Sequence, residues 1–224
     1  MTTTRTQPKD PPKTQTVRDR VTDDLLRAAH EVLEKEGPGA LTVRGIAARA
    51  GISTMAVYSR FGCKAKILEA LYRHGFELLR DELEAVPVSP SSVQDITALG
   101  FAYRRFALSN PGLYGFMFER PLPGFDPTLE SRQDGLRTTF YILVDRVEAF
   151  IKESMGGVGE PVLVSYLIWS AVHGELSLEL TQSVRTPLAG WLVNEPAAAE
   201  SVYGQVIETV LSGLAIRGQA GGNR

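Results

Sequence analysis

Apolar residues recur along most of the chain at the three- and four-residue spacing of an amphipathic α-helix. The first such segment carries Val17, Val21, Leu25, Ala28, Ala29, Val32 and Leu33. This helix is expected to end at Gly37-Pro38-Gly39. A long amphipathic helix is expected between Ile67 and Leu83, ending before Pro87. Further helices are expected at about 92–109, 111–120, 129–155, 162–181 and 196–215. With no strand-like alternation and no internal repeat, the pattern predicts an all-α fold.

Two short helices are predicted between residues 42 and 61. Thr42 can cap the first and Ser53 the second, because a side-chain oxygen there can accept a backbone N–H of the first turn. Gly51, between them, can adopt the positive φ that a tight turn needs. With Ala47 and Val57 facing inward, the pattern predicts an N-terminal three-helix bundle with a helix-turn-helix, followed by a larger C-terminal helical domain.

The composition is that of an ordinary soluble globular protein, with 43% hydrophobic and 22% charged residues. The single cysteine, Cys63, excludes an intrachain disulfide and a cysteine-rich zinc module. The first 16 residues lack the apolar core of a signal peptide, and the longest apolar stretch, 162–172, is too short to span a bilayer. We therefore expect a cytoplasmic protein with no membrane partner.

Charge is divided unevenly along the chain, although the net charge is only −2. Residues 1–66 carry 12 basic and 7 acidic side chains, whereas the remaining residues carry 12 basic and 19 acidic ones. No carboxylate occurs between Thr42 and Lys66. An acid-free surface of this length is expected where a protein approaches a polyanion, and the major groove of B-DNA admits one helix.

The helix-turn-helix supplies candidate DNA contacts. The candidates are Thr42, Arg44, Ser53, Thr54, Met55, Ala56, Tyr58, Ser59 and Lys64. Thr54, Met55 and Ala56 lie near the start of the second short helix, where side chains meet base edges; the other six would contact phosphates. The alternative is a plain corner between two helices, with Tyr58 buried in the core. Phe61 is assigned to the core in both interpretations.

The segment from Leu41 to Ser53, with Tyr58-Ser-Arg-Phe61 and Lys64, resembles the signature of the tetracycline-repressor (TetR) family over about residues 17–70. The resemblance implies a dimer whose recognition helices enter successive major grooves. It also implies phosphate contacts from Thr42, Tyr58 and Lys64, and an all-helical C-terminal domain that binds an effector. Two positions depart from the family pattern: Cys63 replaces a capping polar residue, and Met55 a smaller one.

The stretch from Trp169 to Gly174 resembles a TetR subgroup with a Trp…His-Gly pattern. The expected domains are a disordered basic arm (1–15), the helix-turn-helix DNA-binding domain (16–66), the helical ligand-binding and dimerisation domain (67–218) and a disordered tail (219–224). Homodimerisation is expected through the last two long helices. The final helix carries two apolar stripes, Val202-Val206-Val210 and Tyr203-Ile207-Leu211, which is more than one contact face requires.

Aromatic residues in the C-terminal half are candidates for an effector pocket. An aromatic run near the middle of the chain could line it: Phe101, Tyr103, Phe106, Tyr114, Phe116 and Phe118. The candidates chosen are Phe101, Phe106, Tyr114, Phe118, Trp169 and His173. The alternative is that these residues only pack the core and that His173 is a hydrogen-bonded core histidine. A lone histidine lacks the partners that a metal site needs.

These observations predict a sequence-specific DNA-binding transcriptional regulator. Its expected partners are double-stranded palindromic operator DNA and a small apolar or aromatic effector that releases a repressor. The alternatives are an activator or ligand-independent regulator of the same fold, or a small-molecule-binding helical enzyme. We expect no catalytic residue, cofactor or metal, because GxSxG, HExxH and phosphate-binding glycine loops are absent from the sequence.

Overall fold

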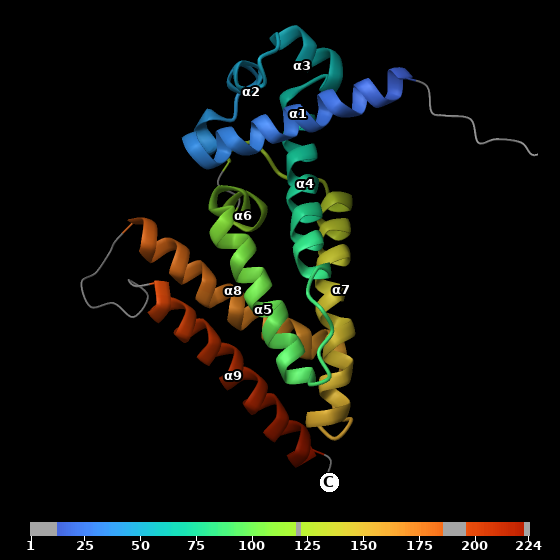
Figure 1. The fold of residues 1–224 in the computed structure, drawn as a ribbon, viewed down its shortest axis with the longest axis vertical. Helices are drawn as coiled ribbons and strands as arrows, with labels where there is room; N and C mark the ends of the chain where they lie inside the picture. The colour runs from blue at the N-terminus through green and yellow to red at the C-terminus, as the bar shows by residue number, and fades with distance from the viewer. Residues whose placement is uncertain (1–12, 120–121, 186–195, 222–224) are drawn as a thin grey trace, which may run out of the picture. The chain divides into compact units, whose positions relative to one another are not determined.

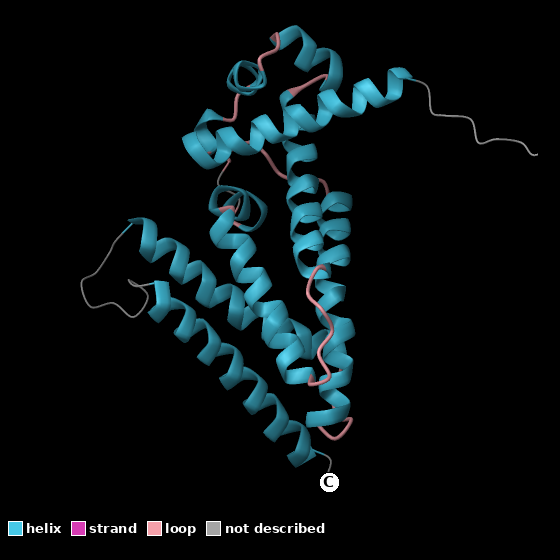
Figure 2. Cartoon of the chain, viewed as in Figure 1, coloured by secondary structure: helices cyan, strands magenta, loops and turns pink. Residues whose placement is uncertain are grey.

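The computed structural model describes residues 13–119, 122–185 and 196–221. Within these ranges all regular secondary structure is helical, which confirms the predicted all-α class (Figure 2). The chain forms two compact units, an N-terminal unit (Met1–Leu71) and a C-terminal unit (Tyr72–Arg224), and the division falls inside helix α4 (Lys64–Glu84). None of the described helices combines the length and apolarity needed to cross a bilayer.

The N-terminal unit is built on α1 (Lys13–Glu36), a 3-10 turn (Pro38–Ala40), α2 (Val43–Ala50) and α3 (Thr54–Phe61). Helix α2 packs against both α1 and α3. The core of this unit contains residues from α1, α2, α3 and the start of α4, including Leu25, Ala29, Ile46, Val57 and Ile67. Burying one side of each short helix leaves the opposite side of α3 in solvent.

Two details of this unit differ from the sequence prediction. Helix α1 begins at Lys13, so residues 13–15 of the predicted arm are helical; the rest of the arm, residues 1–12, lies outside the described residues. The sequence accounts for this start, because Pro11-Pro12 is the last helix-breaking pair before it. Gly37, at φ 80°, ends α1, and Pro38 then starts a 3-10 turn that periodicity does not reveal.

The C-terminal unit contains α5 (Ser92–Ser109), α6 (Pro111–Phe118), α7 (Leu129–Ser154), α8 (Pro161–Arg185) and α9 (Pro196–Gly221). Helices α8 and α9 run side by side, and α5 packs against α7, α8 and α9 (Figure 1). Helix α9 continues into the predicted tail of 219–224, where the Gln219 amide donates to the Ser154 carbonyl at 3.3 Å. Residues 222–224 lie outside the described residues.

Buried ion pairs cross the core of the C-terminal unit. Arg104 of α5 makes two hydrogen bonds to Glu179 of α8, at 2.9 and 2.7 Å, and both side chains are buried. Arg146 of α7 pairs with the buried Asp95 of α5. Fork-shaped guanidinium contacts of this kind fix the relative rotation of the helices they join.

Candidate functional site

Local sequence fixes the geometry of the helix-turn-helix. The Thr42 hydroxyl accepts from the Gly45 N–H at 3.0 Å, and the Ser53 hydroxyl accepts from the Ala56 N–H at 3.2 Å, so both predicted caps are present. Gly51 adopts the left-handed conformation, φ 69° and ψ 25°, that lets the chain turn between the helices. Each hydroxyl that accepts a backbone N–H keeps its own hydrogen free to donate.

All nine predicted DNA contacts lie on the surface of the N-terminal unit. Met55 is 75% exposed and Tyr58 49% exposed, so burial of Tyr58 in the core is excluded. Val57, between them on α3, is fully buried and attaches the helix to the unit. Phe61, assigned to the core, is half-buried.

The cations of the N-terminal unit divide into two groups. Arg49 pairs with Glu36 at 2.6 Å, and Arg60 donates to the Thr22 hydroxyl of α1, so both are held within the unit. Arg60 is therefore partly buried. Arg20, Arg44, Lys64 and Lys66 are exposed and make no ion pair within the part of the chain that the structure describes. They are the cations left available to an external anion.

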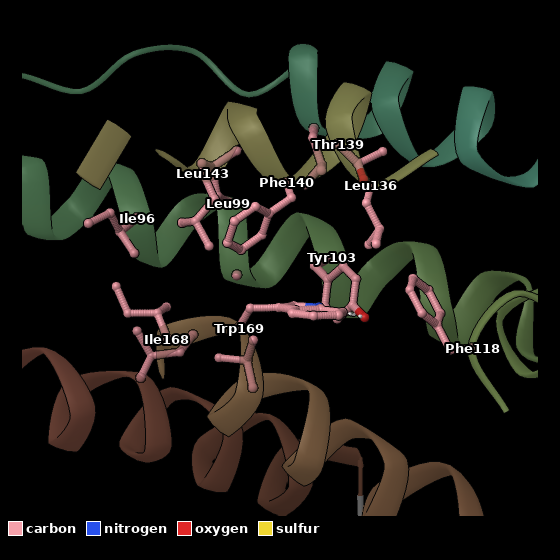
Figure 3. Close-up of a pocket in the computed structure, with 14 residues that line it drawn as sticks. Ile96, Leu99, Tyr103, Phe118, Leu136, Thr139, Phe140, Leu143, Ile168 and Trp169 are labelled. Carbon is pink, nitrogen blue, oxygen red and sulfur yellow. Dashed lines mark hydrogen bonds between the residues drawn. The ribbon is translucent and has the colours of Figure 1, made fainter. Parts of the chain in front are cut away.

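A cavity of about 60 Å³ lies inside the C-terminal unit, between α5, α7 and α8 (Figure 3). Its lining is almost wholly apolar. It is formed by Leu83, Ile96, Leu99, Gly100, Tyr103, Phe118, Leu136, Thr139, Phe140, Leu143, Ile168, Trp169, Val172 and Ile207. No lining residue carries a charge. Thr139 is buried, and its hydroxyl already donates to the Gly135 carbonyl at 2.9 Å.

The six predicted pocket residues fall in three places. Phe118 and Trp169 line the cavity. Tyr114 and His173 lie next to Phe118, with ring centroids 5.0 and 5.3 Å from it. The other two, Phe101 and Phe106, do not line it: Phe101 packs on Tyr203 at 5.7 Å, and Phe106 is buried elsewhere in the core.

Hydrogen-bonding groups gather at one end of this cavity. Tyr103 and Tyr114 place their hydroxyls 2.9 and 2.6 Å from His173 Nδ1, and the Trp169 indole donates to the Tyr103 hydroxyl at 3.4 Å. Burial raises the pKa of Tyr103 to about 12 and also raises that of Tyr114. Burial lowers the pKa of His173, although the negative charge of Glu119 opposes this. This polar cluster (Tyr103, Tyr114, Trp169 and His173) is therefore uncharged at neutral pH.

Tyr103 belongs to the aromatic run that could line a pocket but was not one of the six chosen candidates, although a sequence signal for it exists. Ile96, Leu99 and Tyr103 follow one another at spacings of three and four, which places them on one face of α5. Phe101 is two positions from both Leu99 and Tyr103, on the opposite face. Helical spacing within α5 thus separates the lining residues from the neighbouring aromatic residue.

A row of exposed apolar side chains runs along α8. It consists of Val162, Leu163, Tyr166, Leu167 and Leu178, with exposed Ser170 and Gly174 in the same row. On α9 the stripe Tyr203-Ile207-Leu211 is buried and the stripe Val202-Val206-Val210 is half-buried. The first stripe is therefore covered by the rest of the chain, whereas the second is only partly covered.

Comparison with sequence families gives two matches that together span both units. Residues 25–71 match the family described as "Bacterial regulatory proteins, tetR family". Residues 96–191 match "Tetracyclin repressor-like, C-terminal domain". The chain is also 24% identical, over 196 residues, to the HTH-type transcriptional regulator Rv1816 of Mycobacterium tuberculosis; the match covers 75% of this chain and 84% of that protein.

Solved structures share the fold. A crystal structure of the regulatory protein SCO4313 aligns with a TM-score of 0.71 at 23% identity, covering 90% of this chain and 99% of that one. A tetR-family transcriptional regulator from Streptomyces coelicolor aligns with a TM-score of 0.64 at 18% identity, covering 90% and 89%. At these identities the alignments establish a common architecture.

Proposed function

Because the chain belongs to the tetracycline-repressor (TetR) family of helix-turn-helix, DNA-binding transcriptional regulators, which are not enzymes, we propose that it is a homodimeric repressor that a small molecule releases from its operator. The observation that carries this proposal is the outer face of α3. It is exposed, acid-free and attached to the unit by a buried Val57. Such a face can enter a major groove without repelling the phosphates on either side.

Reach and chemistry support a division of roles on this surface. Thr54, Met55 and Ala56 form the first turn of α3, and Met55 and Ala56 offer apolar contact to a thymine methyl. The free hydroxyl hydrogens of Thr42 and Ser53 can donate to phosphate oxygens. Arg44 and Lys64, together with Tyr58 and Ser59, supply the remaining phosphate contacts.

Dimerisation through α8 and α9 is supported by the exposed apolar row on α8. A palindromic operator requires a two-fold axis, and an isologous interface places the same row on both sides of that axis. Exposed Gly174 and Ser170 would let the two backbones approach closely.

We assign DNA binding to residues 16–66 and ligand binding with dimerisation to residues 67–218. Residues 1–15 and 219–224 are assigned to a basic arm and a tail, except where α1 and α9 extend into them.

The cavity supports binding of a small apolar or aromatic effector. Pockets for such molecules are mostly apolar, with a few placed polar groups, and the polar cluster supplies these here. The cluster includes Trp169 and His173, with rings 5.5 Å apart, so we also propose that the chain belongs to the Trp…His-Gly subgroup. In that case the tryptophan and histidine of the Trp…His-Gly pattern are the residues that form the polar end of the effector cavity.

The DNA contacts are tested with a labelled duplex from the region upstream of the protein's own gene, by footprinting and by titration at several salt concentrations. Tyr58→Ala and Lys64→Ala should weaken binding to cognate and random DNA alike, whereas Thr54→Ala should change the preference among sequences by about 1–3 kcal/mol. The matched control for Lys64→Ala is Lys152→Ala, which removes an equally exposed lysine from α7 of the C-terminal unit. Equal effects of all three variants on both DNAs would contradict the division of roles.

The dimer is tested by light scattering on purified protein. Leu178→Glu places a charge in the α8 row and should yield a monomer that binds a single half-site weakly. Leu129→Glu, equally exposed but on α7, should leave the dimer intact. A dimer that survives Leu178→Glu would move the interface away from α8.

The sign of regulation is tested with a reporter under the same upstream region. Deleting the gene should raise expression if the protein represses. A fall would identify an activator of the same fold, and no change would contradict regulation of this promoter.

A further inference from the structure

Apart from Thr139, whose hydroxyl already donates to the Gly135 carbonyl, two lining residues of the cavity in the C-terminal unit carry a hydrogen-bond donor, and no lining residue carries a charge. Tyr103 and Trp169 line the cavity, and their rings lie together at its inner wall (Figure 3). Tyr114 and His173 complete the cluster but are not lining residues. Among the lining residues, Tyr103 and Trp169 are therefore the candidate donors to a polar group of a molecule in the cavity.

Hydrogen-bond geometry shows which of these groups are available. With its proton on Nε2, the neutral imidazole accepts one hydrogen at Nδ1, and the Tyr114 hydroxyl is the nearer donor at 2.6 Å. Tyr103 is then left to donate to the Tyr114 hydroxyl at 3.2 Å, and Trp169 donates to Tyr103 at 3.4 Å. Both bonds are longer than the usual range for their type. A ligand oxygen can compete for either hydrogen at small cost.

Electrostatics exclude an anionic head group. None of the lining residues is a lysine, arginine or charged histidine. The nearest charge recorded for the cluster is the carboxylate of Glu119, which acts on His173 and accepts from the Ser177 hydroxyl at 3.1 Å. A carboxylate or phosphate in the cavity would lose its hydration without gaining a counter-charge, and it would meet a like charge.

The size of the cavity limits the body of the ligand. An engineered cavity of about 150 Å³ holds benzene, whereas this one measures about 60 Å³. Binding therefore requires movement of a lining side chain, and Phe140 on α7 is a half-buried aromatic residue that can move towards solvent while Trp169 keeps its place. The Phe140 and Trp169 rings meet edge to face, with centroids 6.0 Å apart and ring planes at 62°.

We propose that the effector is an uncharged, mostly apolar molecule with one terminal hydrogen-bond acceptor, such as a ketone, aldehyde or ester oxygen, received by Tyr103 and Trp169. This proposal names the ligand class of the cavity and rests on the proposed effector function. It separates two kinds of lipophilic signal that share an apolar body: carbonyl compounds are accepted and the corresponding carboxylates are rejected.

The test compares methyl ketones of four to ten carbons with carboxylates of the same carbon number at pH 8, titrated by calorimetry into DNA-free protein. We expect at least one ketone to bind more than about tenfold tighter than its matched carboxylate. Tyr103→Phe should weaken that ketone about three- to tenfold, and the exposed Tyr141→Phe should not. NMR of the indole N–H groups gives a second readout. The Trp169 resonance is identified as the one that remains in Trp191→Phe, and it should shift on ketone binding.

Three results would overturn the assignment: carboxylates that bind as tightly as ketones, no binding by any ketone in the series, or ketone affinity unchanged in Tyr103→Phe. None of these depends on DNA, so the repressor proposal would stand if the footprint stands. Conversely, ketone binding without any effect on the DNA complex would leave the ligand class intact and contradict effector release.

Discussion

The two units of the chain place their polar groups in opposite ways. In the N-terminal unit the candidate contacts, from Thr42 to Lys64, are exposed, and the core beneath them is apolar. In the C-terminal unit the polar groups lie inside: Arg104 with Glu179, Arg146 with Asp95, and the tyrosines of the cavity. Apart from the helix caps Thr42 and Ser53, the candidate DNA contacts of the first unit therefore lie outside the groups that stabilise it, whereas these polar groups of the second unit pack within its core.

This difference has a physical origin. DNA is a large, charged partner that remains hydrated at its edges, and exposed side chains can reach it. A small apolar ligand must be surrounded by protein to gain from burial. Substitutions on the outer face of α3, other than at its cap Ser53, should therefore change binding with little change in folding, and substitutions around the cavity should change folding first.

The largest expected effect comes from removing a buried cation. Arg104→Ala leaves the Glu179 carboxylate buried without its partner and should lower the free energy of unfolding by about 3–5 kcal/mol. Its neighbour Arg105 is exposed and pairs with Glu82, so Arg105→Ala should cost at most about 1 kcal/mol. Urea denaturation of both variants checks this. Similar losses would show that buried charge does not hold the C-terminal unit.

A second expectation concerns packing between α4 and α7 in the same unit. A Cβ added at Gly135 would lie 2.7–2.9 Å from ring atoms of Phe76, and the rigid ring cannot yield without shifting its neighbours. Gly135→Ala should cost about 1–3 kcal/mol. Gly115→Ala meets nothing nearer than 3.7 Å and should be neutral or slightly stabilising. Thermal unfolding that ranks the two in reverse order would refute the packing argument.

The same contrast explains what could be predicted from the sequence. The helix-turn-helix is specified locally: a capping hydroxyl at Thr42, a turn glycine at Gly51 and a second cap at Ser53 lie within twelve residues. Each makes its contact within a few positions along the chain. Periodicity and cap chemistry are sufficient for such an element.

The cavity is specified by contacts that are distant in sequence. The hydrogen bonds Tyr103–Tyr114 and Tyr114–His173 span 11 and 59 positions, and the Arg104–Glu179 pair spans 75. Aromatic content located the right part of the chain but could not rank Tyr103 above Phe101, because the choice depends on which face of α5 meets α7 and α8. Only the packed helices decide that.

A smaller effect should follow from removing a cap in the N-terminal unit. Ser53→Ala deletes the acceptor for the Ala56 N–H and should destabilise α3 by about 1 kcal/mol. Ser59→Ala, on the same helix and exposed, removes a hydroxyl that caps nothing and should leave stability unchanged. Hydrogen exchange of the α3 amides in DNA-free protein measures both. Equal protection in the two variants would mean that the cap does not stabilise the helix.

The smallest expected effect is a pH dependence in the C-terminal unit. Burial, together with the nearby Glu179 charge, raises the pKa of Glu175, whose Oε2 is buried without a hydrogen-bond partner; Arg104 opposes the shift. Between the ordinary carboxyl pKa and this raised value, the folded chain holds a proton that the unfolded chain has released. Stability therefore falls as pH rises through that window.

Glu175→Gln keeps the shape of the side chain and removes its titration. We expect the variant to match the wild type near pH 4 and to exceed it in unfolding free energy above the raised pKa, by less than the loss caused by Ser53→Ala. Urea denaturation at several pH values gives the two curves. Parallel curves would show that the wild-type carboxyl titrates normally, and the C-terminal unit would then tolerate an ionised Glu175 as easily as the N-terminal unit tolerates its exposed charges.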